Sequence, residues 1–330
     1  MGNNKFKALR TFEESGNFYR RIVEMDINDL PDGDVLIKVK YSALNYKDAL
    51  SARGHKGITR KYPHTPGVDA AGIVVESNSI DFHEGDEVLV TGYDLGMNTD
   101  GGFGEYIRVP AEWIVPLPTG LTLLDSMILG TAGFTAGIAV YEFQRRDLFP
   151  GKGKILVTGA TGGVGTIAIA ILSKIGYEVT ASTGKRDKEG FLKSIGANDV
   201  ISRADVEDVP NKPLLERRWA GAVDNVGGST LNYCIKSTDY WGSVACIGLV
   251  DSDKFETTVY PFLLRGIALI GIDSADRPMD LRLKIWEKLA GEWKPVCLDK
   301  IYRTVRLEEL SSEIDKILIG GQVGRVILEF

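Results

Sequence analysis

Cysteine and histidine are scarce in this chain of 330 residues, with three of each. The cysteines are odd in number, widely spaced and contain no C-x-x-C pair, so they cannot build a disulfide framework and indicate a reducing compartment. The histidines are not in metal-ligand spacing, and we interpret each as a loop or packing residue. These six residues are Cys234, Cys246, Cys297, His55, His64 and His83.

Excess positive charge and long hydrophobic runs are also missing. Lys and Arg total 39 against 45 Asp and Glu, a net charge of −6, so any phosphate binding must be local rather than a global attraction to nucleic acid or anionic membranes. The most apolar windows, residues 128–143 and 164–176, are interrupted by glycine, whereas a membrane helix needs roughly 20 apolar residues. The first residues lack the apolar segment of a signal peptide. We therefore expect a soluble cytoplasmic protein.

The composition that is present, 44% hydrophobic and 25% charged, is that of a globular protein, and the length favours two domains. The first part, residues 1–125, has the pattern of short strands and turns. The run from Val35 to Tyr41 has a period of two, which predicts a strand: Val35, Ile37, Val39 and Tyr41 alternate with Leu36, Lys38 and Lys40. Further strands are expected at 72–75, 87–90 and 106–109, each bounded by Gly or Pro.

From residue 154 the pattern changes to alternating strands and helices. A short apolar strand at 154–158 leads into a glycine-rich turn and a helix at 164–175 with one apolar face. This alternation predicts right-handed βαβ units on a parallel sheet, so the fold class is α/β with a doubly wound sheet. The further elements expected are strands at 178–182, 199–201, 221–226, 243–248, 269–272 and 325–330, and helices at 187–195, 229–235, 279–290 and 307–318.

The glycine-rich turn is the strongest motif of the chain. It matches the dinucleotide fingerprint G-x-G-x-x-G with Ala160 in the first position and Gly162 and Gly165 in the second and third. Gly162 lets the backbone approach a pyrophosphate, and Gly165 lets the helix lie close to the strand. A tight turn without a ligand is the alternative. The cofactor-binding residues expected here are Thr158, Ala160, Gly162, Gly163, Val164 and Gly165.

The type of dinucleotide is predicted at the end of the second strand. An NAD enzyme places an acid there for the ribose 2′-hydroxyl, about 20 residues after the glycines. Residues 182–186 contain no acid, and Thr183 and Lys185 can bind a 2′-phosphate by charge-assisted hydrogen bonds. The segment therefore favours NADP(H), with an ordinary solvated turn as the alternative.

Four segments together resemble the medium-chain dehydrogenase/reductase superfamily over the whole length. They are the runs at 82–88 (FHEGDEV), 101–106 (GGFGEY), 130–136 (GTAGFTA) and 160–165 (ATGGVG). The resemblance implies a GroES-like catalytic domain formed by residues 1–125 and 266–330, with a Rossmann domain at 126–265 inserted in it. It also implies a homodimer through edge pairing of the Rossmann sheets.

The zinc alcohol dehydrogenases of that superfamily carry a Cys near the position of Asn45 and Gly-His-Glu where this chain has Gly67, Val68 and Asp69. The thiolate and the imidazole are both replaced, and no four-cysteine cluster exists for a structural zinc. We therefore expect no metal site and exclude a zinc alcohol dehydrogenase.

Within the zinc-free branch, four further runs are similar to the YhdH/YhfP-type quinone oxidoreductases, which include acrylyl-CoA reductases. They lie at 43–50 (ALNYKDAL), 62–69 (YPHTPGVD), 261–266 (PFLLRG) and 271–274 (GIDS). The resemblance implies an NADPH-dependent oxidoreductase that transfers hydride to an activated conjugated carbonyl compound, either a quinone or an enoyl-CoA thioester.

Candidate catalytic residues follow from this resemblance and from chemical type. They are Asn45 and Tyr46, expected to line the nicotinamide and substrate cleft, and Asp69 with Arg325, expected to orient the site. The alternatives are structural: Asn45 as a turn residue, and Asp69 with Arg325 as an ion pair that holds domains together. Further residues expected in the cofactor cleft are Thr131, Thr135, Asn225, Gly248 and Ser274.

A basic segment without any acid, residues 51–62, bears on the substrate. It contains Arg53, Lys56, Arg60 and Lys61, which could receive the phosphates of coenzyme A, although a solvated loop is the simpler alternative. Two other functions stay open: a reductase that detoxifies quinones and aldehydes without CoA preference, and a non-enzymatic NADPH-binding protein.

Overall fold

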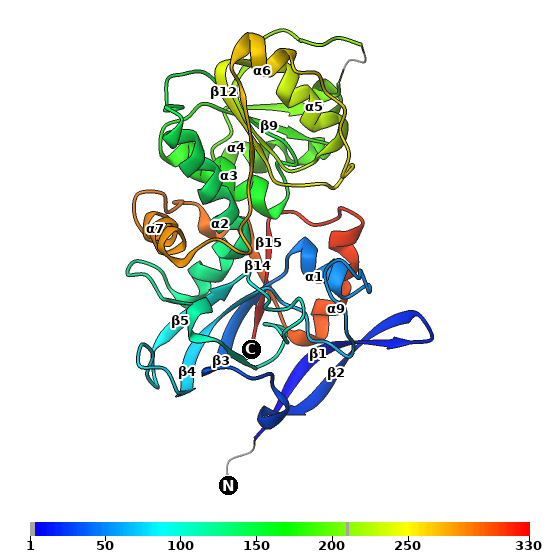
Figure 1. Ribbon diagram of the computed structural model, residues 1–330, viewed down its shortest axis with the longest axis vertical. Helices are drawn as coiled ribbons and strands as arrows, with labels where there is room; N and C mark the ends of the chain where they lie inside the picture. Colours follow the sequence, from blue (N-terminus) through cyan, green and yellow to red (C-terminus); the bar gives the residue numbers. More distant parts are fainter. Residues whose placement is uncertain (1–3, 209–210) are drawn as a thin grey trace. The chain divides into compact units, whose positions relative to one another are not determined.

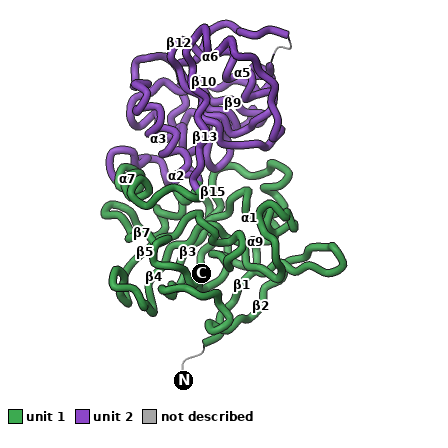
Figure 2. Tube along the Cα trace, in the orientation of Figure 1, with its two compact units in different colours: residues 1–131, 275–290, 302–330 green, residues 132–274, 291–301 purple. Residues whose placement is uncertain are grey.

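The computed structural model describes residues 4–208 and 211–330. The chain divides into two compact units: unit 1 spans residues 1–131, 275–290 and 302–330, and unit 2 spans residues 132–274 and 291–301 (Figure 2). The sequence suggested divisions after residues 125 and 265. The structure places 266–274 in unit 2 because β13 (Ala268–Gly271) pairs with the sheet of that unit. Segment 291–301 also joins unit 2, which no local pattern indicated.

Unit 1 is built on a seven-stranded, mostly antiparallel sheet with the order β14-β15-β3-β4-β5-β7, and β6 pairs with β3 (Figure 1). Val35, Ile37 and Val39 are buried in its core, and Lys38 between them is exposed, so the predicted strand is confirmed; Leu36 departs from the alternation because it is buried in a second cluster. The strands are β3 (Val35–Ala43), β4 (Asp69–Ser77), β5 (Glu87–Thr91), β6 (Tyr106–Val109), β7 (Ile114–Pro116), β14 (Tyr302–Val305) and β15 (Arg325–Glu329).

Three helices and a hairpin complete unit 1. The helices are α1 (Tyr46–Ser51), α7 (Met279–Ala290) and α9 (Leu307–Leu318), and the last two have the bounds that the sequence predicted. The hairpin of β1 (Lys5–Glu14) and β2 (Asn17–Asp26) forms a separate two-stranded sheet that the sequence analysis did not identify. Its polar and apolar residues do not alternate cleanly, and Phe18 of β2 packs edge-on against Tyr62 of a loop.

Unit 2 is a six-stranded parallel sheet with the order β10-β9-β8-β11-β12-β13. The order runs outward from β8 in both directions, which confirms the doubly wound sheet. The strands are β8 (Ile155–Val157), β9 (Val179–Thr183), β10 (Asp199–Ser202), β11 (Trp219–Asp224), β12 (Thr238–Cys246) and β13. The helices are α3 (Gly163–Lys174), α4 (Glu189–Ser194), α5 (Gly228–Ser237), α6 (Tyr260–Arg265) and α8 (Leu298–Ile301).

The helix after the glycine turn is more deeply buried than its pattern indicated. The sequence predicted one apolar face, but every residue of α3 from Gly165 to Leu172 is buried. A helix that is apolar or small on all sides fits only where the chain covers it completely. The start of α3 is thereby held rigidly beside β8 and β9, against which it packs.

A long apolar helix, α2 (Leu123–Arg145), carries the chain from unit 1 into unit 2. It is long and apolar enough to cross a membrane by length and composition, but 78% of its apolar window is buried inside the fold, as in the core helix of a globular protein. The expected glycine interruption of this window is present at one position, Gly130, where the helix is kinked. The helix continues through Gly133 and Gly137 and has non-helical dihedral angles only at Gly130 (φ 50°, ψ −155°).

Candidate functional site

Asp69 is the centre of a buried polar network in unit 1. It begins β4 and is fully buried. Its carboxylate accepts hydrogen bonds from the Thr131 hydroxyl (2.6 Å), the Thr131 backbone N–H (3.0 Å) and the Asn45 side-chain amide (2.8 Å). Arg325 donates a longer bond of 3.4 Å. Burial raises the pKa of the Asp69 carboxyl, and the Arg325 charge and these hydrogen bonds oppose the shift.

Arg325 comes from the start of β15 and is 2% exposed. Its guanidinium donates to the side-chain oxygen of Asn45 (3.0 Å) and to the carbonyl of Ile128 (3.1 Å). It also donates to the carbonyl of Leu44 (3.3 Å). Burial lowers the pKa of Arg325, and the nearby carboxylates of Asp69 and Asp48 hold the charged form. The predicted pairing of Asp69 with Arg325 is present, and Asn45 joins it.

The network leaves Asn45 without a free donor for a substrate. Its amide nitrogen donates to the Asp69 carboxylate and to the carbonyl of Ala43 (3.1 Å), and its oxygen accepts from Arg325. An amide nitrogen has two hydrogens, and both are used. The geometry therefore supports a structural and electrostatic role for Asn45, Asp69 and Arg325, the alternative that the sequence left open.

Gly130 explains why the network and the kink of α2 occur together. A Cβ atom at this position would lie 2.4 Å from the Asp69 carboxylate and 2.8 Å from the Arg325 guanidinium. Only glycine allows the backbone to approach this ion pair at a positive φ. Thr131, predicted as a cofactor residue, lies in this network, and its hydroxyl hydrogen is directed to Asp69.

Asp48 is a second buried carboxylate that the sequence analysis did not place in the site. It accepts from the backbone N–H groups of Asn45 (2.7 Å) and Val68 (2.8 Å) and has no exposed surface. Burial raises its pKa to about 7, and the charge of Asp69 adds to this effect. The signal in the sequence was the spacing: an Asp three residues after an N-cap Asn accepts the N-cap backbone N–H.

Tyr46 differs from the other predicted catalytic residues. It is the first residue of α1 and is partly exposed. Its hydroxyl has no hydrogen-bond partner among the residues that the structure describes, whereas the polar atoms of Asn45, Asp69 and Arg325 are engaged with one another. Tyr46 is therefore the member of the predicted set that retains a donor for a substrate oxygen.

In unit 2, the glycine turn between β8 and α3 has the geometry that the fingerprint requires. A Cβ at Gly165 would lie 2.5 Å from the carbonyl oxygen of Gly159, so the close contact of helix and strand needs glycine there. Ala160 is buried, whereas Gly162, Gly163 and Val164 are partly exposed. No side chain caps the N-terminus of α3 at Gly162. Uncapped N–H groups at a helix N-terminus suit a pyrophosphate, so this turn fits a dinucleotide.

Cations gather beside the end of β9. Lys185 is partly buried, and Thr183 accepts the Lys185 backbone N–H (3.0 Å). Burial lowers the pKa of Lys185. The Asp187 carboxylate opposes this shift, and the nearby cations Lys188 and Arg203 add to it. The guanidinium of Arg203 lies against Gly184, since a Cβ there would be 3.5 Å from its central carbon. An anion would relieve the repulsion among these cations, which fits a 2′-phosphate.

Arg203 was missed by the sequence analysis, although the parallel sheet offered a signal. Ser202, the last residue of β10, pairs with Thr183, the last residue of β9. Residues that follow paired ends of parallel strands lie side by side, so Arg203 falls next to Gly184. Finding it required the pairing of β10 with β9, which no single segment reveals.

Thr158 and Asn225 are joined at the carboxyl ends of β8 and β11. The Thr158 hydroxyl donates to the buried carboxylate of Asp224 (2.7 Å) and accepts the Asn225 backbone N–H (3.0 Å). Burial raises the pKa of Asp224 to about 6. Thr158 is 1% exposed and thus lies beneath the cofactor edge rather than on it. A Cβ at Gly248 would lie 2.0 Å from the Asn225 carbonyl oxygen, so Gly248 permits this close approach.

Thr135 and Ser274, the remaining predicted cofactor residues, are brought together in unit 2. The Thr135 hydroxyl donates to the Ser274 hydroxyl at 2.9 Å, although 139 positions separate them in the sequence. Ser274 follows β13 at the carboxyl edge of the sheet, the same edge as Asn225 and Gly248. The predicted cofactor residues of unit 2 therefore share one edge of one sheet.

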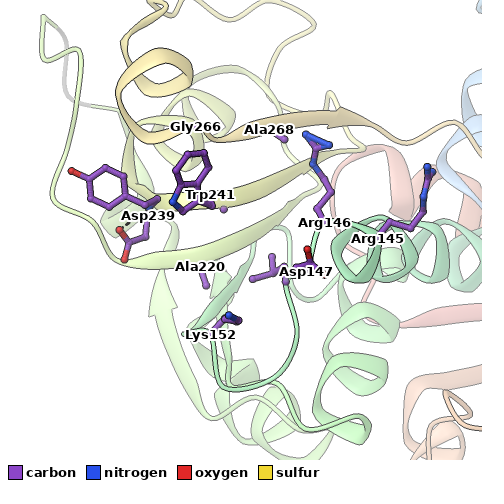
Figure 3. A pocket seen from close by; sticks show the side chains of 12 residues that line it. Arg145, Arg146, Asp147, Lys152, Ala220, Asp239, Trp241, Gly266 and Ala268 are labelled. Carbon is purple, nitrogen blue, oxygen red and sulfur yellow. Dashed lines mark hydrogen bonds between the residues drawn. The ribbon is translucent and has the colours of Figure 1, made fainter.

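A hollow of about 530 Å³ lies at the opposite edge, at the amino ends of β11, β12 and β13 (Figure 3). Ala220, Trp241 and Ala268 line it from these strands, and Arg146 and Lys152 from the segment after α2. None of the predicted cofactor residues lines this hollow, so it is separate from the dinucleotide edge.

Metal ligands do not gather anywhere in residues 4–208 and 211–330: no group of three or more His, Cys, Asp or Glu side chains could hold an ion. His64 is buried, with its ring nitrogens near the Gly96 carbonyl (2.9 Å) and Asp100 (3.4 Å). It therefore has the packing role that the sequence predicted.

Comparison with known proteins agrees with this geometry. Residues 31–119 match the family described as alcohol dehydrogenase GroES-like domain, and residues 163–290 match the family described as zinc-binding dehydrogenase. The chain is 47% identical to the "Putative quinone oxidoreductase YhfP" of Bacillus subtilis over 98% of each protein. It is 42% identical to the acrylyl-CoA reductase AcuI of Ruegeria pomeroyi over 96% of each.

Solved structures show the same relationship. The Salmonella enterica YhdH oxidoreductase, in complex with NADP, is 38% identical and superposes with a TM-score of 0.95 over 98% of this chain and 99% of its own. The Bacillus subtilis YhfP structure, with NAD bound, is 46% identical with a TM-score of 0.97 over 99% of this chain and 100% of its own. The resemblance seen in the sequence motifs is thus confirmed along the full length. The chain belongs to the medium-chain dehydrogenase/reductase family, in the group that contains the YhfP and YhdH oxidoreductases and the acrylyl-CoA reductases.

Proposed function

We propose that this protein is an NADPH-dependent reductase of a carbon–carbon double bond conjugated to a thioester carbonyl, of the acrylyl-CoA class, and that it works without a bound metal ion. The relatives named above include an acrylyl-CoA reductase and proteins crystallised with NADP or NAD. The observation that carries the choice of substrate is the basic loop at residues 51–62 of unit 1.

One cation of this loop is already engaged. Lys56 forms an ion pair with Glu13 (2.9 Å) and lies over the rings of Phe18 and Tyr62 (5.4 and 5.1 Å). The Tyr62 hydroxyl in turn donates to the Ser51 carbonyl (2.7 Å). These contacts fasten the loop to the β1–β2 hairpin and give it a defined shape. Lys56 is therefore a residue that shapes the loop rather than a phosphate ligand.

The other three cations, Arg53, Arg60 and Lys61, are exposed and form no ion pair within the part of the chain that the structure describes. Such a group in a chain of net charge −6 attracts an anion locally. The loop begins where α1 ends, and Tyr46 begins that same short helix. Coenzyme A carries its phosphates at the far end of the pantetheine chain from the acyl group, so cations separated from Tyr46 by the length of α1 suit those phosphates. A plain quinone offers this loop nothing to bind.

The preference for NADPH over NADH is supported by Lys185 and Arg203. These cations lie beside Thr183, and the nearby acid, Asp187, is exposed and paired with Lys188 (2.7 Å). A 2′-phosphate would be bound by charge-assisted hydrogen bonds at this point, whereas a 2′-hydroxyl would offer these cations no charge.

When bound, the nicotinamide supplies a hydride for the β-carbon of the substrate. Negative charge then develops on the thioester carbonyl oxygen, and Tyr46 donates a hydrogen bond to it or a proton toward the α-carbon. The network of Asn45, Asp69 and Arg325 holds the start of α1 in place, because Arg325 also binds the carbonyl of Leu44. Asp69 lies in the region where the zinc enzymes have Gly-His-Glu, and here the Arg325 cation balances its charge.

The experiment is to follow NADPH and NADH oxidation by the purified protein with acrylyl-CoA, free acrylate and a small benzoquinone. We expect NADPH-dependent turnover of the CoA ester to exceed that of the other two. Replacing Arg53, Arg60 and Lys61 together by Ala is expected to raise the KM for acrylyl-CoA tenfold or more, since each exposed charge contact contributes roughly 0.5–1 kcal/mol. The KM for NADPH should stay unchanged.

The matched control replaces three exposed lysines of unit 2, Lys152, Lys174 and Lys212, by Ala, which changes the net charge equally. It should leave the KM for acrylyl-CoA within a factor of two. Quinone turnover without response to the CoA ester would overturn the thioester assignment and leave a quinone reductase. NADPH binding without oxidation by any of the three compounds would support the non-enzymatic alternative.

We further propose that the protein is a homodimer formed through unit 2. Strand β13 is at the edge of the six-stranded sheet, and an exposed edge strand is a template for pairing with another chain. The segment that leads into it exposes a series of large apolar side chains, and a surface of this kind is typical of a protein interface. They are Leu249, Val250, Phe255, Val259, Tyr260, Leu263 and Leu264.

A further inference from the structure

The sheet of unit 2 determines which half of a dinucleotide lies near which strand. A pyrophosphate at the start of α3 is at the switch point between β8 and β11, where the strand order reverses direction. The cations that suit the 2′-phosphate of the adenosine half, Lys185 and Arg203, follow β9 and β10 on one side. The nicotinamide half must then extend to the other side, over the carboxyl ends of β11 and β12. Asn225 directly follows β11.

The side-chain amide of Asn225 has one orientation. Its nitrogen donates to the backbone carbonyl of Thr158 at 2.8 Å. A carbonyl only accepts, so the nitrogen and the oxygen of the amide cannot exchange places. The oxygen, Oδ1, therefore points elsewhere. It is buried and has no hydrogen-bond partner in the described structure.

An unsatisfied buried acceptor is energetically unfavourable, so such an atom calls for an explanation. Thr158 supports the arrangement twice, since its carbonyl holds the Asn225 amide and its hydroxyl accepts the Asn225 backbone N–H (3.0 Å). The carboxylate of Asp224 fixes the direction of that hydroxyl by accepting its hydrogen (2.7 Å) and is itself anchored by the backbone N–H of Gly227 (2.8 Å).

We propose that Oδ1 of Asn225 accepts a hydrogen bond from an N–H or O–H donor on the nicotinamide riboside half of the bound dinucleotide, and that Thr158 and Asp224 are positioning residues that hold it in this orientation. The inference rests on the proposed binding of NADPH. The donor is either the carboxamide N–H of the nicotinamide or a hydroxyl of its ribose, which offer the same chemistry to an acceptor.

The test compares the Kd of NADPH with that of 2′,5′-ADP, which contains only the adenosine half. Replacing Asn225 by Ala is expected to weaken NADPH binding about five- to tenfold, the effect of one hydrogen bond of roughly 1 kcal/mol or slightly more. Binding of 2′,5′-ADP should change less than twofold, which also shows that unit 2 is folded. Thr158→Val removes the hydroxyl that accepts the Asn225 backbone N–H and keeps the backbone carbonyl, so Asn225 is held less firmly and NADPH should be weakened in the same selective way.

The matched control is Arg203→Ala, which should weaken NADPH and 2′,5′-ADP alike. The 3-acetylpyridine analogue of NADPH, which lacks the carboxamide N–H, distinguishes the two donors. If Asn225→Ala does not weaken the analogue, the donor is the carboxamide, and if it weakens the analogue as much as NADPH, the donor is a ribose hydroxyl.

An unchanged Kd for NADPH in Asn225→Ala, or an equal loss for 2′,5′-ADP, would overturn the inference. A wild-type protein that binds NADPH but does not reduce acrylyl-CoA would contradict the proposed function and leave the role of Asn225 standing. A wild-type protein without affinity for NADPH would overturn both.

Discussion

Tyr46 and Asn45 are adjacent in the sequence, yet the fold gives them different chemistry. The Asn45 amide is enclosed between Arg325, Asp69 and the Ala43 carbonyl, so its polar atoms serve the protein. Tyr46 begins a helix at a partly exposed position. Both residues are polar and both matched the same sequence motif. The difference arises because Arg325, which lies 280 positions away from Asn45, occupies its oxygen.

Replacing Tyr46 by Phe is expected to lower kcat for acrylyl-CoA about 100-fold, because the hydroxyl is the donor for the developing oxyanion or the proton source. The Kd for NADPH should stay within a factor of two. Stopped-flow measurement of NADPH oxidation distinguishes an effect on the rate of reduction from an effect on NADPH binding. The control is Tyr41→Phe on β3 of the same unit. An undiminished kcat in Tyr46→Phe would show that the proton comes from another group or from water.

Among the secondary-structure elements, the short helix α1 is held in position by the buried carboxylate of Asp48. Asp48 ties the backbone of Asn45, at the start of α1, to the backbone of Val68, which precedes β4. The charges nearest to it in this network are the carboxylate of Asp69 and the guanidinium of Arg325. The helix has only six residues and could not persist by itself, so these tertiary bonds hold it in place.

The raised pKa of Asp48 predicts a pH dependence of stability. The folded-state pKa of about 7 exceeds the ordinary value of 3.8, so between these values the folded protein binds more protons than the unfolded chain. The free energy of unfolding contributed by Asp48 is therefore highest at low pH and decreases as the pH rises from about 4 to 7. The total change is of the order of 1–4 kcal/mol.

Urea unfolding of the wild type and of Asp48→Asn at pH 5, 6, 7 and 8 measures this contribution. We expect the free energy of unfolding of the wild type minus that of Asp48→Asn to decrease with increasing pH, because the buried carboxylate of the wild type becomes charged. Asp29→Asn, at an exposed position, is the control and should show a constant difference. A constant difference for Asp48→Asn would contradict the raised pKa.

For the whole molecule, the proposed dimer interface can be tested independently of the catalytic activity. Replacing Leu263 and Leu264 by Glu introduces charge on α6, where both side chains are exposed by more than half. We expect the particle mass in sedimentation equilibrium to fall from twice 36.1 kDa to 36.1 kDa. Charged side chains would have to be buried without partners in the interface, which is unfavourable.

Ile80→Glu is the matched control, because Ile80 is 90% exposed and lies in unit 1. It should leave the mass unchanged. A wild type that sediments as a monomer at micromolar concentration would refute the dimer. A dimer that persists in the Leu263 and Leu264 variant would show that its interface lies elsewhere.

Elements whose cause is local could be predicted from the amino-acid sequence alone. Apolar alternation identified β3, and the helical periods of α7 and α9 identified their bounds, because side-chain period follows directly from backbone geometry. The glycine turn was predictable as well, since only glycine tolerates contacts of the kind found at Gly165. The absence of an acid in residues 182–186 already favoured NADP(H).

Which polar groups are bound within the protein, and which are left for ligands, depends on contacts between distant parts of the chain. Arg203 reaches Gly184 through the pairing of neighbouring strands, and Lys56 is removed from the cationic set by Glu13 of a hairpin that no pattern revealed. Arg325 and Asp69, far apart in the chain, determine the state of Asn45. The physical reason is that hydrogen bonds and charges act through space, so their partners are chosen by packing and not by spacing along the chain.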